Sequence, residues 1–275
     1  WRPHILVFVA DLQRNVGMVR MANHFSQERG IVTVSTLLLG DLEDHAQASE
    51  IASRNRELLE ANGIVAFAET AAVTELEAGM ITVAQANGMA GLSSNMVMFG
   101  WPGEDRERLA RLLGLVRRMT SLEKSSMIVR PVKGSRSKGN GEIVVWWKGK
   151  ENNGDMMLLL AHLLSLASGW RTTTVVLKSV MDDQDAADAV HRAFESMLPD
   201  LRMEVRLEVI LRPPDQTYVD VIRAASQNAD MVFMGMAVPE SGTEMVYAEQ
   251  LMALLDGLPS TILVRNASRF HGRLV

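Results

Sequence analysis

The chain has 275 residues, of which 47% are hydrophobic and 22% are charged, and its formal net charge is -5. This length allows one large domain or two domains of about 100–150 residues each. The acidic balance excludes the basic footprint of a nucleic-acid-binding protein. The absence of cysteine excludes disulfides, thiol catalysis and cysteine-ligated metals. No apolar run approaches the roughly 20 residues that a membrane-spanning helix requires.

The N-terminus leads directly into an apolar stretch, without the basic and apolar regions of a signal peptide. The first residue is tryptophan rather than an initiator methionine. We therefore expect the chain to be a piece of a longer protein.

Residues 1–133 alternate short apolar runs with stretches of helical period. The runs predict five buried parallel strands, and the stretches between them predict four helices. Asp11 is expected to cap the first helix, in preference to contacting a ribose hydroxyl. Thr74 and Glu77 have the spacing of a capping box. The predicted strands are 4–10, 31–39, 64–68, 95–100 and 126–130.

Residues 141–275 repeat this rhythm. Two pairs of residues, Asp182 with Asp185 and Ser241 with Glu244, are expected to cap two of the helices. The predicted strands are 143–147, 173–180, 203–210, 231–236 and 261–264, and the predicted helices are 154–168, 183–197, 215–228 and 242–256.

Five strands alternating with four helices, twice over, indicate an α/β fold made of two similar subdomains. Each subdomain is expected to hold a mostly parallel five-stranded sheet with helices on both faces. The basic run over residues 134–140 is expected to be the linker. It would separate a first subdomain, residues 1–133, from a second one, residues 141–275.

The second half opens with an unusual stretch around a pair of tryptophans. Adjacent strand residues point to opposite faces of a sheet, so one ring should enter the core and the other should face the opposite layer. The helix that follows is apolar on nearly every face and needs cover on two sides. Packing against the other subdomain or a second protomer is therefore favoured over a ligand-stacking platform. The candidate packing or interface residues are Trp146, Trp147, Met156, Met157 and Leu160.

Ligands of open parallel sheets bind at the carboxyl ends of the strands. The turns that begin at Gly100 and Gly235 lack a dinucleotide fingerprint and a Walker A motif, and both carry carboxylates that disfavour phosphate. The six histidines lack the spacing of a zinc site. No nucleophile elbow or Ser-His-Asp arrangement occurs. We therefore expect no enzyme activity, no cofactor and no bound metal.

Several stretches, in order along the whole chain, together resemble the cytoplasmic C-terminal domain of the cation-chloride cotransporters, members of the amino acid-polyamine-organocation superfamily. The opening WRPHILVF resembles that family's entry strand, and Gln13-Arg14-Asn15 resembles its T-R-N turn. Residues 88–101 are similar to its G-L-G-x-x-K-P-N-x-x-x-x-G-[FY] segment. IVVWWKGKENNGDMMLLLAHLL resembles its V-W-W-L-x-D-D-G-G-L-T-L-L-x-P-Y-L-L segment, and MVFMGMAVP and LPSTILVR resemble its final strands.

The sequence departs from the family pattern at several places, and the missing insert and tail favour a compact prokaryotic-type member. The glycine loop is shortened and lacks Lys-Pro, the D-D-G-G turn is ENNGD here, and the long insert and regulatory tail of animal members are missing. The family's domain has two halves that each resemble a universal stress protein. Typical stress proteins carry G-x-x-G and later G-[ST] after the fourth strand. The turns from Gly100 and Gly235 do not continue into this pattern, which argues against ATP binding.

The resemblance implies a non-catalytic regulatory and dimerisation domain of a secondary transporter that cotransports chloride with sodium and/or potassium. Its partners would be the transporter's own transmembrane domain and a second copy in a homodimer, with no nucleic acid and no direct membrane insertion. It would lie at the cytoplasmic face of the cell membrane. The alternative is a free-standing universal stress-type protein that binds adenine nucleotide. A hydrolase on a doubly wound sheet is disfavoured, because no nucleophile constellation is present.

Overall fold

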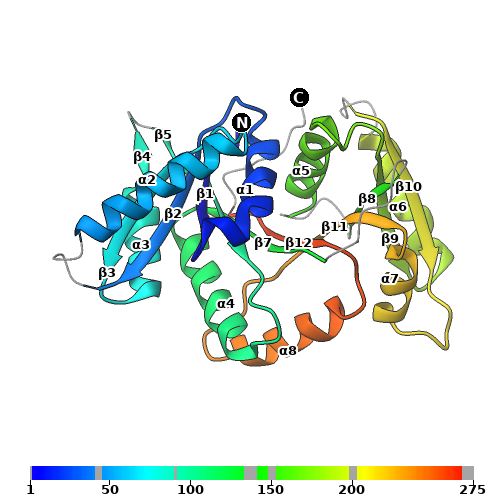
Figure 1. Ribbon diagram of the computed structural model, residues 1–275. Coiled ribbons are helices and arrows are strands. Elements are labelled where there is room, and N and C mark those ends of the chain that lie inside the picture. The colour runs from blue at the N-terminus through cyan, green and yellow to red at the C-terminus, as the bar shows by residue number, and fades with distance from the viewer. Residues whose placement is uncertain are drawn as a thin grey trace.

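The computed structural model describes residues 2–40, 45–89, 92–132, 141–147, 153–197 and 203–267. One continuous sheet of ten strands runs through the molecule in the order β10-β9-β8-β11-β12-β7-β6-β1-β2-β3 (Figure 1). A separate two-stranded hairpin is formed by β4 (Gly88–Met89) and β5 (Leu92–Ser93). The architecture is α/β with a mostly parallel sheet, as predicted.

The first half contributes five parallel strands in the order β3-β2-β1-β6-β7. A helix lies between each of these strands and the next one along the chain, as is usual for parallel strands. The strands are β1 (Ile5–Phe8), β2 (Val32–Leu39), β3 (Phe67–Val73), β6 (Met96–Gly100) and β7 (Ser125–Arg130), and the helices are α1 (Leu12–Ser26), α2 (His45–Ala61), α3 (Leu76–Ala86) and α4 (Arg106–Ser121).

The second half repeats this order as β10-β9-β8-β11-β12, again with parallel pairing. The strands are β8 (Glu142–Trp146), β9 (Thr174–Met181), β10 (Val205–Leu211), β11 (Ala229–Gly235) and β12 (Thr261–Arg265), and the helices are α5 (Gly154–Leu166), α6 (Gln184–Met197), α7 (Tyr218–Ser226) and α8 (Glu244–Leu255).

Two hydrophobic clusters, one on each face of the sheet, form the core. Alternation along β1 sends Ile5 and Val7 to one cluster and Leu6 and Phe8 to the other. Side chains of α1, α2, α5 and α6 pack on the first face, and those of α3, α4, α7 and α8 pack on the second. Both faces of the sheet are therefore covered in each half, which explains why the strands are nearly continuous apolar runs.

The two five-stranded sheets are joined edge to edge, a connection that the sequence did not predict. β7 and β12, the last strand of each half, pair antiparallel from Arg130 opposite Thr261 to Ser126 opposite Arg265. The expected linker, residues 134–140, lies outside the described residues, and the subdomain boundaries stay a prediction.

The third strand differs from its predicted range of 64–68. β3 begins at Phe67 and continues through Glu69 to Val73, because it pairs residue by residue with β2. Pairing with the neighbouring strand, rather than local apolar content, sets these bounds.

Asp11 caps α1 as predicted: its carboxylate accepts from the amides of Gln13 and Arg14 at 2.9 and 3.4 Å. The capping box at Thr74 and Glu77 was wrong. α3 starts after Glu75, whose side chain forms no cap, and Glu77 instead pairs with a neighbouring helix.

Two further caps were also wrong. The carboxylate that caps α6 is that of Asp183, which accepts from the Ala186 amide at 2.8 Å. The N-cap residue of α8 is Thr243, and the side chain of Glu244 accepts from the amide of Gly242 at 2.7 Å. In both cases the correct residue lies one or two positions from the predicted one, within the usual uncertainty of helix ends.

Candidate functional site

The join between the halves has internal two-fold pseudosymmetry. Ile128 pairs with Leu263, and these are the fourth residues of the similar segments SSMIVR and STILVR. A pseudo-two-fold axis therefore passes between them. The flanking hydrogen bonds obey the same symmetry. The Ser125 hydroxyl accepts from the Ala267 amide at 3.1 Å, and the Ser260 hydroxyl accepts from the Val132 amide at 2.9 Å.

On the first face, α1 and α5 meet across this axis (Figure 1). The Gln27 side-chain amide donates to the Leu163 carbonyl at 2.8 Å. The rings of Phe25 and Phe233 meet edge to face with centroids 6.3 Å apart. Apolar packing and the partly buried hydrogen bond from Gln27 to Leu163 thus hold the two halves together on this side of the sheet.

The five candidate packing residues are all at least nine-tenths buried within the single chain. Trp147 packs in the cluster of the first face with the α5 residues, whereas Trp146 packs in the cluster of the second face. The two rings therefore lie on opposite faces of the sheet. The Trp146 indole N–H donates to the Ser226 hydroxyl at 3.0 Å. The α5 residues of this set are Met156, Met157 and Leu160.

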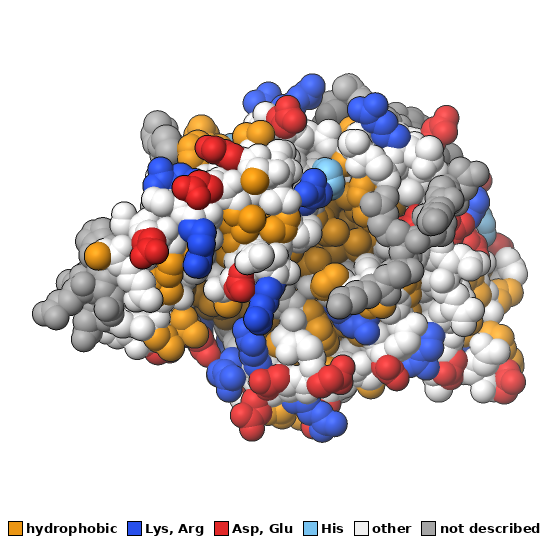
Figure 2. All heavy atoms as spheres, viewed as in Figure 1, with side chains coloured by type: hydrophobic (Ala, Val, Ile, Leu, Met, Phe, Trp, Pro, Cys, Tyr) orange, Lys and Arg blue, Asp and Glu red, His pale blue; other side chains and the backbone are white. Residues whose placement is uncertain are grey.

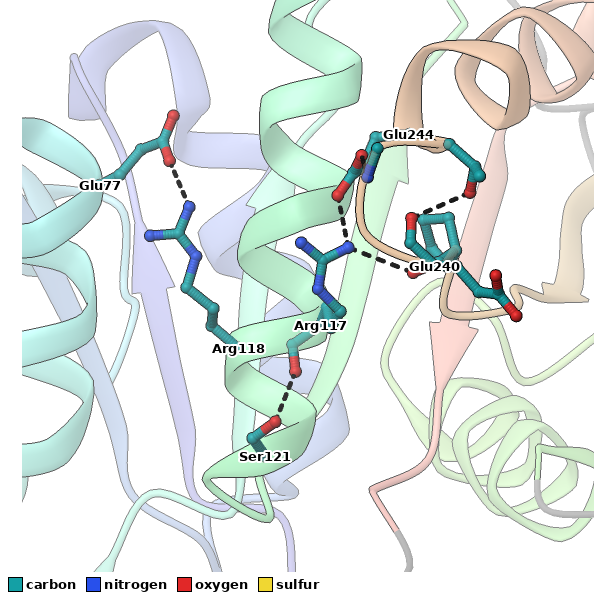
Figure 3. A network of polar contacts seen from close by, with 9 residues as sticks. Glu77, Arg117, Arg118, Ser121, Glu240 and Glu244 are labelled. Atoms are coloured by element: carbon teal, nitrogen blue, oxygen red, sulfur yellow. Dashed lines mark hydrogen bonds and ion pairs between the residues drawn. The ribbon is translucent and has the colours of Figure 1, made fainter.

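On the second face, α4 and α8 meet through charged groups (Figure 3). The Arg117 guanidinium pairs with the Glu244 carboxylate and donates to the Pro239 carbonyl at 3.2 Å. The ion pair with Arg117 lowers the pKa of Glu244. Arg118, the residue after Arg117 in α4, pairs with Glu77 of α3 at 2.7 Å. A single turn of α4 therefore ties together α3 of its own half and α8 of the other.

The surface over α4 and α8 also carries charged side chains. Figure 2 shows a hollow near the middle of one face, between the two halves, where hydrophobic side chains gather. Basic and acidic side chains are spread below this hollow, over α4 and α8. Those within the two helices are arginines and glutamates.

A cavity of about 350 Å³ lies at the carboxyl ends of β1, β2 and β6, where ligands of such sheets bind. The stacked rings of Phe8 and Phe99, with centroids 5.7 Å apart, form part of its wall. Arg108 and Arg111 of α4 also line it. The α4 N-terminus is occupied by the chain itself, because the Asp105 carboxylate accepts from the Arg108 amide at 2.9 Å.

In the second half, Asn153 precedes α5 and bridges the chain just beyond the ends of β11 and β12. Its side-chain amide donates to the Met236 carbonyl at 3.1 Å, and its oxygen accepts from the Asn266 amide at 2.8 Å. A Cβ atom at Gly235 would lie 3.0 Å from the Asn153 side-chain nitrogen, so a larger residue there would push the Asn153 side chain away by a few tenths of an ångström. Asn153 belongs to the turn ENNGD, residues 151–155.

A second cavity, of about 320 Å³, lies between β3 and α3 at the other end of the strands. His4, Thr33 and Glu69 line it together with apolar side chains. Burial raises the pKa of the Glu69 carboxyl, and the nearby Ser35 hydroxyl opposes this shift without forming a hydrogen bond of normal geometry. Sequence reasoning missed both cavities and Glu69. The lone carboxylate in the strand segment FAETAAV was the available signal.

Among the residues that the structure describes, no three His, Asp or Glu side chains gather closely enough to hold a metal ion. Within the same residues, no helix combines the length and apolarity needed to cross a membrane.

No protein-family model matches the sequence. The fold is similar to that of the cytoplasmic domain of a prokaryotic cation chloride cotransporter, with a TM-score of 0.69 and 16% identity over 98% of this chain and 97% of the other. A universal stress protein from Archaeoglobus fulgidus DSM 4304 is similar at a TM-score of 0.63 and 16% identity, covering 97% and 98% of the two chains. A protein of unknown function from Pseudomonas aeruginosa PAO1 has a TM-score of 0.55 at 15% identity, covering 95% and 92%.

Proposed function

We propose that the chain is a non-catalytic cytoplasmic domain of a secondary transporter that cotransports chloride with sodium and/or potassium. In this role it regulates the transporter and holds it as a homodimer. The observation that carries the proposal is the match of almost the whole chain, with its two joined halves, to the cytoplasmic domain of a cation chloride cotransporter. The ordered family-like segments quoted above support the same assignment.

The reading frame upstream of the Trp1 codon tests this proposal. A cotransporter requires about a dozen apolar segments of roughly 20 residues each before this domain. Their presence would support the assignment. An initiation codon directly before Trp1 would contradict it.

The proposed homodimer cannot use the last strand of either half, because β7 and β12 already pair with each other. Of the described strands in the main sheet, β3 and β10 form its two edges. A second copy would therefore add to one of these edges or contact a helical face. Sedimentation of the purified chain at increasing concentration tests this step, and a monomer at every concentration would contradict it.

The alternative is a free-standing universal stress-type protein that binds adenine nucleotide. One observation favours it: the cavity at the carboxyl ends of β1, β2 and β6 is lined by Arg108 and Arg111. Calorimetry with ATP separates the two proposals. Saturable binding that is lost in Arg111→Gln would support the alternative, and the absence of binding heat would contradict it.

A further inference from the structure

The second half has a buried lysine at a position where the first half has a serine. In the second half, Lys178 of β9 lies beside Glu208 of β10 in the strand register. In the first half, the same positions of β2 and β3 are held by Ser35 and Glu69. The equivalence is fixed by the neighbouring first strands, because Lys178 pairs with Trp146 and Ser35 pairs with Phe8, each at the end of its strand.

Lys178 is almost fully buried and its ammonium group has three anionic or dipolar partners. It lies 3.0 Å from the Glu208 carboxylate and 3.6 Å from that of Glu142. It also donates to the Ala225 carbonyl at 2.9 Å, in the last turn of α7. A buried ammonium group needs such compensation, because desolvation of an unpaired charge is costly.

The first half keeps one of the two carboxylates, Glu69 in place of Glu208, but lacks the ammonium group. Within the described part of the chain, Glu69 Oε1 and Ser35 Oγ are buried and form no hydrogen bond. The last turn of α3, which corresponds to that of α7, borders the same cavity through Val83 and Ala86. The carbonyl end of a helix favours a positive charge.

The cavity beside Glu69 occupies the region that the Lys178 ammonium fills in the other half. His4 stands at the position equivalent to Glu142 and lines this cavity. Burial, and secondarily the charge of Arg2, lower the pKa of His4. His4 therefore stays neutral at neutral pH and does not supply the missing charge.

We propose that this cavity binds a small organic cation with a primary ammonium group and an aliphatic tail. The ammonium group takes the place of the Lys178 ammonium, between Glu69 and the last turn of α3. The tail lies along the apolar part of the wall, toward the exposed side chains of Phe67 and Leu92. A metal cation would leave this wall unused, which is why an alkylammonium ion is favoured. The apolar wall is formed by Ile31, Phe67, Val83, Ala86 and Leu92.

Calorimetric titration of the purified chain with hexylammonium chloride tests this inference. We expect saturable binding by the wild type and binding at least about tenfold weaker in Glu69→Gln, because a charge-assisted hydrogen bond is lost. Glu50→Gln, a matched change on the exposed surface of α2, should bind as the wild type does. Equal binding by Glu69→Gln, or equal binding of uncharged hexanol, would overturn the inference.

Ser35→Lys supplies a second and independent test. The new ammonium group should occupy the cavity as Lys178 does in the other half, raise the melting temperature and abolish the response to hexylammonium. Hexylammonium binding that persists in a folded Ser35→Lys protein would overturn the inference. Displacement of hexylammonium by equimolar potassium or sodium chloride would also overturn it, because the site would then recognise the charge without the tail.

Discussion

Ile128 and Leu263 pair with each other across the antiparallel join of β7 and β12, and they occupy equivalent positions in the two halves. A residue that pairs with its own counterpart marks a two-fold axis. The chain is therefore a single-chain version of a symmetric pair, with the last strand of each half closing one continuous sheet. Interfaces of this isologous kind use each contact twice.

The hydroxyl groups of Ser125 and Ser260 are the symmetric hydrogen-bond acceptors at this join. Both residues are nearly or fully buried. We expect Ser125→Ala and Ser260→Ala each to lower the free energy of unfolding by about 1–2 kcal/mol, because a backbone amide loses its acceptor. Urea denaturation measures this. The double variant should be additive, since the two bonds lie at opposite ends of the strand pair.

Ser241→Ala is the matched control, because Ser241 is exposed near the start of α8. Its effect should stay within about 0.5 kcal/mol. A control variant that loses as much stability as Ser125→Ala would show that the join is not what these hydroxyls stabilise.

The ion pair between Arg117 and Glu244 should stabilise the contact of α4 with α8 in a pH-dependent way. Arg117 lowers the pKa of Glu244 below its ordinary 4.5. The contribution is thus present above pH 4.5 and is lost as the pH falls through the lowered pKa. We expect Arg117→Met to lower the melting temperature at pH 7, with the difference from the wild type shrinking under acid conditions.

Arg106→Met serves as the comparison for this prediction. Arg106 also reaches α8, at 3.4 Å from Glu249, but both side chains are more than half exposed. Exposed pairs contribute little. A pH-independent loss in Arg117→Met, equal to that in Arg106→Met, would mean that the Glu244 carboxylate takes no part.

Lys178 should be essential to the second half. Lys178→Met removes an ammonium group that is 6% exposed and leaves the carboxylates of Glu142 and Glu208 without it. We expect a loss of about 2–4 kcal/mol in the free energy of unfolding. Arg206→Met removes an exposed partner of the same Glu142 and should have a much smaller effect. Equal losses of stability in Lys178→Met and Arg206→Met would contradict the claim that the buried Lys178 ammonium stabilises the second half.

Glu69 should destabilise the first half when it is ionised. Its pKa in the folded state is raised above 4.5 by burial. The folded chain therefore gains stability as the pH falls through the raised pKa, and this gain is complete below pH 4.5. We expect Glu69→Gln to be more stable than the wild type at pH 7 and no more stable at pH 4. Thermal melts across this range, without added amine, measure the effect.

The duplication was readable because five apolar runs alternate with four stretches of helical period, and this order occurs twice along the chain. The fold class and most elements followed from it. The join of β7 to β12 could not be predicted, because a strand buried on both faces has the same composition at an edge as in the middle of a sheet. The prediction of a helix cap was wrong where two adjacent carboxylates could each serve as the cap, as at Asp182 and Asp183.

The cavity beside Glu69 was beyond sequence reasoning for a different reason. The inference about this cavity depends on a comparison of paired strands. Ser35 pairs with Glu69 in the first half, whereas Lys178 pairs with Glu208 in the second. Strand register is not written in either strand alone. The placement of Trp146 and Trp147 on opposite faces was easier to predict, because they are adjacent in sequence and the pleat of a strand alternates its side chains.

Chloride uptake is the measurement that tests the proposed function most directly. The complete protein encoded by this reading frame would be reconstituted in vesicles, and radioactive chloride uptake would be followed with sodium, potassium, both or neither outside. The account predicts uptake that requires one or both cations. Because the proposed cotransport is electroneutral, uptake should not respond to an imposed membrane potential. Chloride uptake that is absent, or that proceeds equally well without sodium and potassium, would contradict it.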